Sequence, residues 1–99
     1  MKQIIRYKKK ILAIIVRNAI SNKKKGIQFF SPNNFNQQLG LFNHESGKVI
    51  KPHSHNKFIR KINKTTEVLF ILNGKLRVDF YKNSKNYLYS KIIKKNDLI

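Results

Sequence analysis

Hydrophobic residues in this chain occur in short runs that are separated by charged or turn-forming residues. The runs are rich in β-branched and aromatic side chains, which favour pleated strands. Turn signals recur at intervals of about ten residues, and no segment has the periodicity or the caps of a helix. The pattern therefore predicts an all-β chain of short strands, as found in sandwiches and small barrels.

The first strong run, Ile11–Arg17, predicts a buried strand because it is β-branched and flanked by charge. Asn73-Gly74 is a favoured pair for a type I′ turn, so the runs on either side of it predict a hairpin. Polar and apolar residues alternate along 75–81, which is typical of a half-buried antiparallel strand. In total, strands are expected at residues 11–17, 26–30, 37–43, 49–55, 67–72, 75–81 and 87–93.

Residues 1–10 are expected to form a basic N-terminal segment ahead of one β domain over residues 11–99. The segment lacks the long apolar region and small-residue cleavage site of a secretory signal. The apolar run Ile11–Val16 is far shorter than the ~20 residues that cross a bilayer. We therefore expect no membrane span and a cytoplasmic location.

Composition narrows the classes of function. The 99 residues leave room for one domain, and the absence of cysteine excludes disulfides, thiolate catalysis and cysteine-based zinc sites.

A net charge of +18 favours contact with polyanions. However, Lys, Asn and Ile are abundant together, which indicates A·T-biased codon usage. A nucleic-acid module needs clustered charge with stacking aromatics. Neither is evident on one strand face, so a basic nucleic-acid-binding module is the less favoured alternative function, and no specific nucleic acid is expected as a partner.

Possible metal ligands lie between Gly47 and Gly74. His53 and His55 are one residue apart, so in a strand they would share a face about 6.5–7 Å apart. Glu67 opens the next apolar run and can supply a carboxylate from a neighbouring strand. Two imidazoles and one carboxylate suit Fe(II), Mn(II), Zn(II) or Ni(II). Alternatively, all three are solvated surface side chains.

Basic residues near these ligands leave two interpretations open. In a regular strand Lys51 would share the inward face of the histidines. Either Pro52 marks a bulge that changes the phase, or Lys51 lies at the barrel mouth and meets an anion. Arg60 and Lys61 could attract anions such as sugar nucleotides, or they could be plain loop residues.

The order Gly47, His53-Ser54-His55, Glu67 and Gly74 resembles the first of the two motifs of the cupin superfamily. In most cupins the Glu follows the second His more closely, whereas here residues 56–66 intervene. That spacing resembles small cupins found among bacterial polysaccharide-biosynthesis genes. The resemblance implies a cupin-type double-stranded β-helix (jelly roll), a divalent metal ion and an anionic sugar-type ligand, in polysaccharide or nucleotide-sugar metabolism.

The C-terminal residues Asn96-Asp97-Leu98-Ile99 resemble the opening of the second cupin motif. The resemblance therefore implies a truncated barrel that is incomplete or open at its C-terminal end, without the closing strands. We expect a homodimer that covers the open sheet edges.

An inactive truncated form is one alternative to a working metal-binding cupin. Another is a metal-free sugar-nucleotide ketoisomerase or epimerase that uses the histidines as acid and base, although Glu67 in the metal position argues against it. No catalytic residue can be chosen from the sequence.

Overall fold

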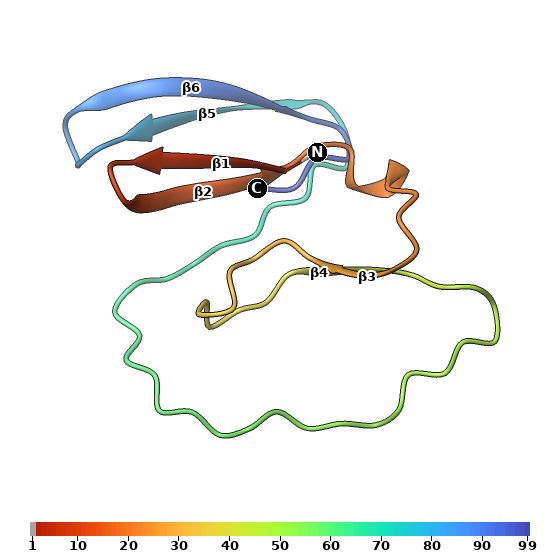
Figure 1. Cartoon of the computed structure of the whole chain (residues 1–99). Helices are drawn as coiled ribbons and strands as arrows, with labels where there is room; N and C mark the ends of the chain where they lie inside the picture. Colours follow the sequence, from red (N-terminus) through yellow and green to blue (C-terminus); the bar gives the residue numbers. More distant parts are fainter. Residues whose placement is uncertain (1) are drawn as a thin grey trace. The chain divides into compact units, whose positions relative to one another are not determined.

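The computed structural model describes residues 2–99 (Figure 1). The described chain is all-β, and its strands pair as three two-stranded antiparallel sheets with no closed barrel among them. None of the described residues belongs to a helix long and apolar enough to cross a membrane. The strands are β1 (Lys2–Tyr7), β2 (Lys10–Val16), β3 (Gly26–Phe29), β4 (Gly40–Asn43), β5 (Lys75–Tyr81) and β6 (Tyr87–Lys94), and the 3₁₀ turn η1 spans Ala19–Ser21.

The chain divides into two compact units. Unit 1 contains residues 2–22 and 68–99, and unit 2 contains residues 23–67. Unit 1 therefore holds the β1–β2 and β5–β6 hairpins, and unit 2 holds the β3–β4 hairpin. The predicted strands over residues 11–17, 26–30 and 87–93 are confirmed within one or two residues, because each has local strand chemistry and a hairpin partner.

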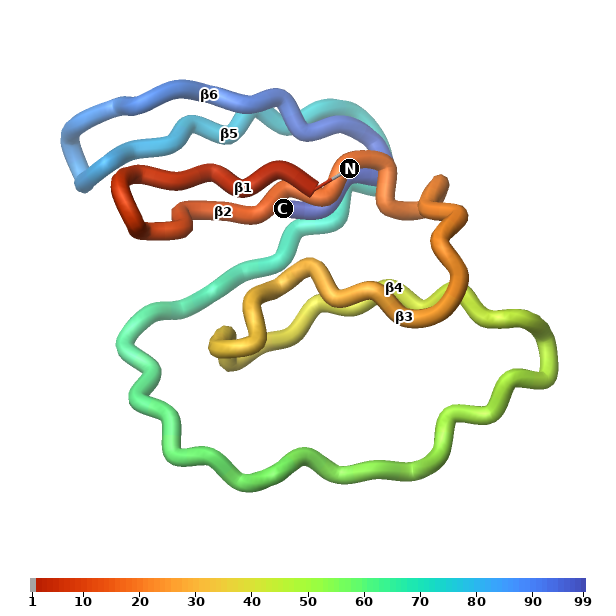
Figure 2. Tube along the Cα trace, viewed as in Figure 1, coloured from red at the N-terminus to blue at the C-terminus, as the bar shows by residue number. Residues whose placement is uncertain are grey.

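The core of unit 1 lies between its two hairpins (Figure 2). Ile5 and Ile15 pack there against Phe80 and Ile93, and all four side chains are buried. The expected alternation of β5 is present, since Phe80 is buried and Val78 is half-buried, while their polar neighbours are exposed. Burying these side chains supplies the hydrophobic free energy that holds the two hairpins together.

The C-terminal residues 96–99 lie between β2 and residues 69–71, and bond to both. Val16 and Leu98 exchange two backbone hydrogen bonds of 2.9 Å. On the other side, Leu69 donates to Ile99 at 2.8 Å and accepts from it at 3.0 Å. These bonds satisfy peptide groups on both sides of the C-terminal segment, as buried backbone requires.

The predicted hairpin between residues 67–72 and 75–81 is wrong. Gly74 does adopt the expected positive φ of +80°, but β5 pairs with β6, and residues 69–71 bond to residues 96–99 instead. A turn signal fixes where the chain bends, whereas the pairing partner depends on which strand edge lies alongside. Here the C-terminal segment occupies the edge that the hairpin would have used.

The predicted strand over Val49–His55 is also wrong, since residues 48–63 carry no strand and are exposed. Pro52 has no N–H to give to a ladder. The stretch also lacks a hydrogen-bonded partner strand among the described residues. Without a partner, alternating side chains alone do not hold a segment in a sheet, because the backbone groups bond to water instead.

Unit 2 is organised by the β3–β4 hairpin and the loop that joins its strands. Gly40 lets the Phe29 ring pack closely over the start of β4, since a Cβ there would lie 3.0 Å from that ring. Within the loop, the Gln38 amide nitrogen donates to the carbonyls of Pro32 and Phe35, at 2.9 Å each. The Gln38 side chain therefore fixes the loop, which explains why the expected strand over 37–43 begins only at Gly40.

Candidate functional site

His53 and His55 lie close together in the extended segment of unit 2. Their ring centroids are 5.4 Å apart and the ring planes meet at 68°. The His53 Nδ1 atom is 3.2 Å from the carbonyl oxygen of Lys51. Because a carbonyl can only accept, Nδ1 carries the hydrogen in this contact, and in the neutral imidazole the lone pair is then on Nε2. That arrangement is the one found in metal-binding histidines, whose second nitrogen donates to a carbonyl.

Glu67 lies outside this pair. The described residues contain no group of three or more His, Cys, Asp and Glu side chains arranged to hold a metal ion. The structure thus brings His53 and His55 together, but Glu67 is not grouped with them. The three predicted ligands therefore do not form a complete metal site in this structure. Lys51 is exposed, and it meets His53 through its backbone carbonyl and not through its ammonium group.

An open pocket of about 620 Å³ adjoins His55. Arg60 lines it and is held in place by two hydrogen bonds from Nη1, to the Phe35 carbonyl at 3.0 Å and to Asn36 Oδ1 at 3.4 Å. The guanidinium also lies over the Phe58 ring, 5.4 Å from its centroid. The remaining lining residues are Gln38, Ser54, His55 and Asn56.

The pocket chemistry favours an anion with hydroxyl groups. Arg60 supplies a fixed positive charge, and amide and hydroxyl side chains supply donors and acceptors. No carboxylate lines the pocket. The sequence suggested Arg60 as an anion contact, but it did not indicate that Asn36 or Phe58 would lie beside it, because no motif links residues so far apart. Lys61, the second suggested residue, is exposed and does not line the pocket.

No family model, curated protein or solved structure matches the chain.

Proposed function

We propose that the chain is a small cupin-like protein that binds one divalent metal ion through His53 and His55, with Glu67 joining them when the ion binds. The observation that supports this most directly is the imidazole pair, with ring centroids 5.4 Å apart and His53 Nδ1 engaged by a carbonyl. The pair also belongs to a stretch that resembles the first cupin motif, with Glu67 following in the same order. Fe(II), Mn(II), Zn(II) and Ni(II) all accept such ligands.

Metal binding is proposed to order the segment that carries these ligands. Residues 48–63 have no secondary structure and are exposed, so an approach of Glu67 to the histidines would break no strand pairing in this segment. Part of the binding free energy would then order the backbone. In this proposal the segment approaches the strand arrangement of a jelly roll only in the metal-bound form.

The pocket beside His55 is proposed to bind an anionic sugar-type molecule. Arg60 would contact its acidic group, while Asn36 and Asn56 would meet its hydroxyls and Phe58 its ring face. The sugar-nucleotide ketoisomerase or epimerase alternative would use the same pocket without a metal. No specific contact in the structure favours that alternative over the metal-binding function.

We also propose that the chain acts as a homodimer. Ile59 and Ile62 are 107% and 65% exposed, and exposed apolar side chains of this kind are typical of a surface that meets a partner. A single two-stranded hairpin such as β3–β4 is marginally stable alone, and its strand edges are open to pairing. A second copy would cover both features.

Calorimetric titration with Zn²⁺ and Ni²⁺ tests the metal site, beside circular dichroism to follow strand content. Wild type is expected to bind one ion per chain and to gain strand signal. The His53→Ala, His55→Ala double variant should lose binding, and Glu67→Gln should weaken it about tenfold or more.

His44→Ala is the matched control, because His44 is the remaining histidine of unit 2 and stands outside the motif. It should bind the ion like the wild type. Equal binding by the double variant, or no binding by a folded wild type, would reject the metal site.

A further inference from the structure

Two hairpin turns from distant parts of the chain lie side by side in unit 1. The β1–β2 turn is formed by Lys8 and Lys9, and the β5–β6 turn spans residues 82–86. The Lys82 Nζ atom lies 6.0 Å from the centroid of the Tyr7 ring, so the turns are in contact. Both occupy the same end of the two hairpins (Figures 1 and 2). We call residues 7–10 and 81–87 the twin-turn surface.

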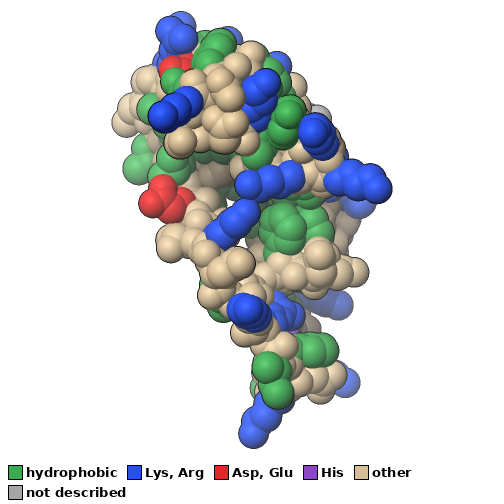
Figure 3. Space-filling model, turned by 90° about the vertical axis from the view of Figure 1, so that its left-hand side faces the viewer, with side chains coloured by type: hydrophobic (Ala, Val, Ile, Leu, Met, Phe, Trp, Pro, Cys, Tyr) green, Lys and Arg blue, Asp and Glu red, His purple; other side chains and the backbone are tan. Residues whose placement is uncertain are grey.

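The twin-turn surface concentrates positive charge. Its five lysines are exposed, and the surface contains no acidic residue. The nearest acid in the sequence, Asp79, is engaged by Arg77 and by the Ser90 hydroxyl. Figure 3 faces this end of the molecule, and its upper part shows blue Lys and Arg side chains around green hydrophobic ones. Uncompensated lysines grouped in this way form an electrostatic site for a polyanion.

Exposed aromatic rings flank the β5–β6 turn that carries Lys82 and Lys85. Tyr81 and Tyr87 are 46% and 52% exposed, and their ring centroids are 5.8 Å apart at an interplanar angle of 74°. The Tyr7 ring is half-buried and carries both Lys8 and Lys82 over it, at 5.5 and 6.0 Å. Rings that face solvent beside ammonium groups can stack on bases while the lysines contact phosphates.

The backbone of both turns is defined by local contacts. Asn83 Oδ1 accepts hydrogen bonds of 3.1 Å from the amides of Lys85 and Asn86. In the other turn Lys8 has a φ of +54°, a conformation that favours Gly or Asn. A lysine in such a position is strained, and strained positions cluster at functional sites. The turns therefore present the lysines and tyrosines on a fixed frame.

We infer that the twin-turn surface binds single-stranded nucleic acid without sequence preference. Duplex DNA would contact the lysines alone, since its bases are already stacked, and a sulfated polysaccharide offers no base to stack. The exposed tyrosines are the feature that favours a single strand. The inference requires none of His53, His55 and Glu67, so it stands or falls independently of the proposed metal site.

Fluorescence anisotropy with a labelled 15-nucleotide oligo(dT) tests the inference across a series of salt concentrations. Wild type should bind, with log K falling linearly against log salt. Changing Lys8, Lys9, Lys82 and Lys85 together to Gln should reduce the magnitude of that slope by up to about 3. Tyr81→Leu and Tyr87→Leu should each weaken oligo(dT) binding at least about fivefold.

Two controls separate this surface from general charge. A variant with Lys23, Lys25, Lys57 and Lys61 changed to Gln loses the same charge from unit 2 and should keep the wild-type salt slope. Dextran sulfate binding, measured by competition, should be unchanged by the tyrosine substitutions. The inference is overturned if both lysine variants behave alike, because binding then depends on total charge and not on this surface. It is also overturned if the folded tyrosine variants bind oligo(dT) as the wild type does, because the surface then binds polyanions by charge alone.

Discussion

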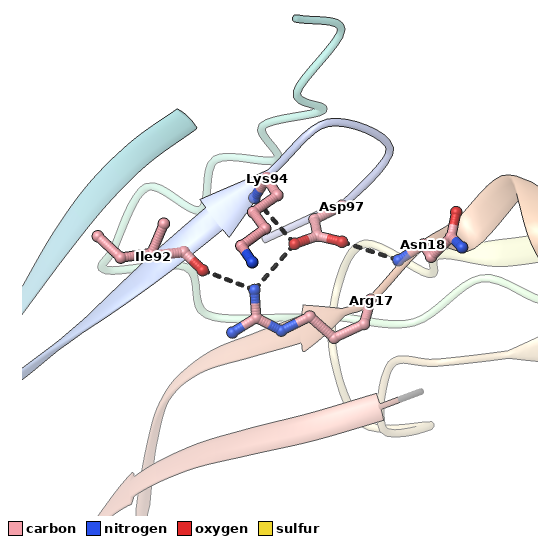
Figure 4. A network of polar contacts seen from close by, with 5 residues as sticks. All are labelled: Arg17, Asn18, Ile92, Lys94 and Asp97. Carbon is pink, nitrogen blue, oxygen red and sulfur yellow. Dashed lines mark hydrogen bonds and ion pairs between the residues drawn. The ribbon is translucent and has the colours of Figure 1, made fainter. Parts of the chain in front are cut away.

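The Arg17 guanidinium donates to Asp97 Oδ2 at 2.8 Å, although the two residues are eighty positions apart in the chain (Figure 4). The Asp97 carboxylate also accepts from the backbone amides of Asn18 at 2.8 Å and Lys94 at 2.9 Å. Arg17 donates in addition to the Ile92 carbonyl at 2.7 Å. One buried carboxylate therefore connects the end of β2 to the end of β6 and to the C-terminal segment.

Asp97→Asn should destabilise the protein by about 2–3 kcal/mol. Asp97 is only 4% exposed, and a carboxamide cannot accept all three hydrogen bonds while its NH₂ group meets the donors of Arg17. Urea unfolding measures the change. Asp79→Asn is the control, because Asp79 is exposed and should change the free energy of unfolding much less. Equal destabilisation by the two variants would show that the buried network has no special role.

Stability should fall in acid in a way that depends on Asp97. Burial alone would raise the pKa of Asp97, but the hydrogen bonds from the Lys94 and Asn18 amides and from Arg17 outweigh it, so the pKa is lowered. A carboxyl with a lowered pKa in the folded state stabilises that state above its ordinary pKa, and this contribution is lost as the pH drops through the lowered value. Unfolding free energies between pH 7 and pH 2 should decline more steeply for the wild type than for Asp97→Asn. Parallel curves would contradict this assignment.

Local sequence features predicted β2, β5 and β6 of unit 1 but missed β1, which lies in the expected basic N-terminal segment. They also did not predict how the strands pair. Phe80 and Val78 alternate with polar residues, and that alternation is visible in the sequence because it depends only on the adjacent positions. Pairing is different, because it depends on which distant segment reaches a free edge. The bonds between residues 69–71 and 96–99 are of this kind, and the local Asn73-Gly74 signal pointed to another partner.

The same limit applies to the candidate sites. His53 and His55 could be predicted to lie together, because two residues of separation keep them close in any extended backbone. Glu67 could not be placed in the same way, since its distance from the histidines depends on the path of residues 56–66. Tyr7 and Lys82 meet only because the two hairpins of unit 1 pack together, and no sequence pattern links their positions.

Ionic strength should act in opposite directions on the two proposed ligands. The net charge of +18 repels a divalent cation, and salt screens that repulsion. The titrations run from about 50 to 300 mM KCl, a range that includes the concentration of about 0.1 M at which the Debye length is about 10 Å. Affinity for Ni²⁺ should stay constant or rise over this range, whereas oligo(dT) affinity should fall steeply. Calorimetry and anisotropy on one preparation measure both. A parallel fall in the two affinities would indicate that the metal signal is not specific binding.

Dimerisation should depend on the exposed apolar stretch of unit 2. Ile59→Asp places a charge where a partner copy is expected to cover an apolar side chain that is now fully exposed, so the dimer dissociation constant should rise about tenfold or more. Light scattering after size-exclusion chromatography, over a dilution series, measures this constant. Ile20→Asp is the control, because Ile20 is also exposed, at 68%, but belongs to unit 1. A monomeric wild type at all concentrations would reject the homodimer.

Lys8→Gly should make the protein more stable and its oligo(dT) binding weaker. The φ of +54° at Lys8 is unfavourable for a residue with a Cβ, so Gly removes about 1–2 kcal/mol of backbone strain from the folded state. Gly also gives the unfolded chain more conformational entropy, which destabilises the folded state by about 0.5–1 kcal/mol. The expected net gain is up to about 1.5 kcal/mol. Loss of the ammonium group should reduce the salt slope by about 0.7.

Lys9→Gly provides the matched comparison for that substitution. Lys9 occupies the same turn but is not among the residues with positive φ, so Gly there removes the same charge, relieves no strain and lowers stability through the added freedom of the unfolded chain. Urea unfolding and anisotropy on both variants should therefore give opposite stability changes with similar losses of binding. If Lys8→Gly stabilises the turn and leaves oligo(dT) binding intact, Lys8 is merely a strained turn residue and makes no contact with the phosphates.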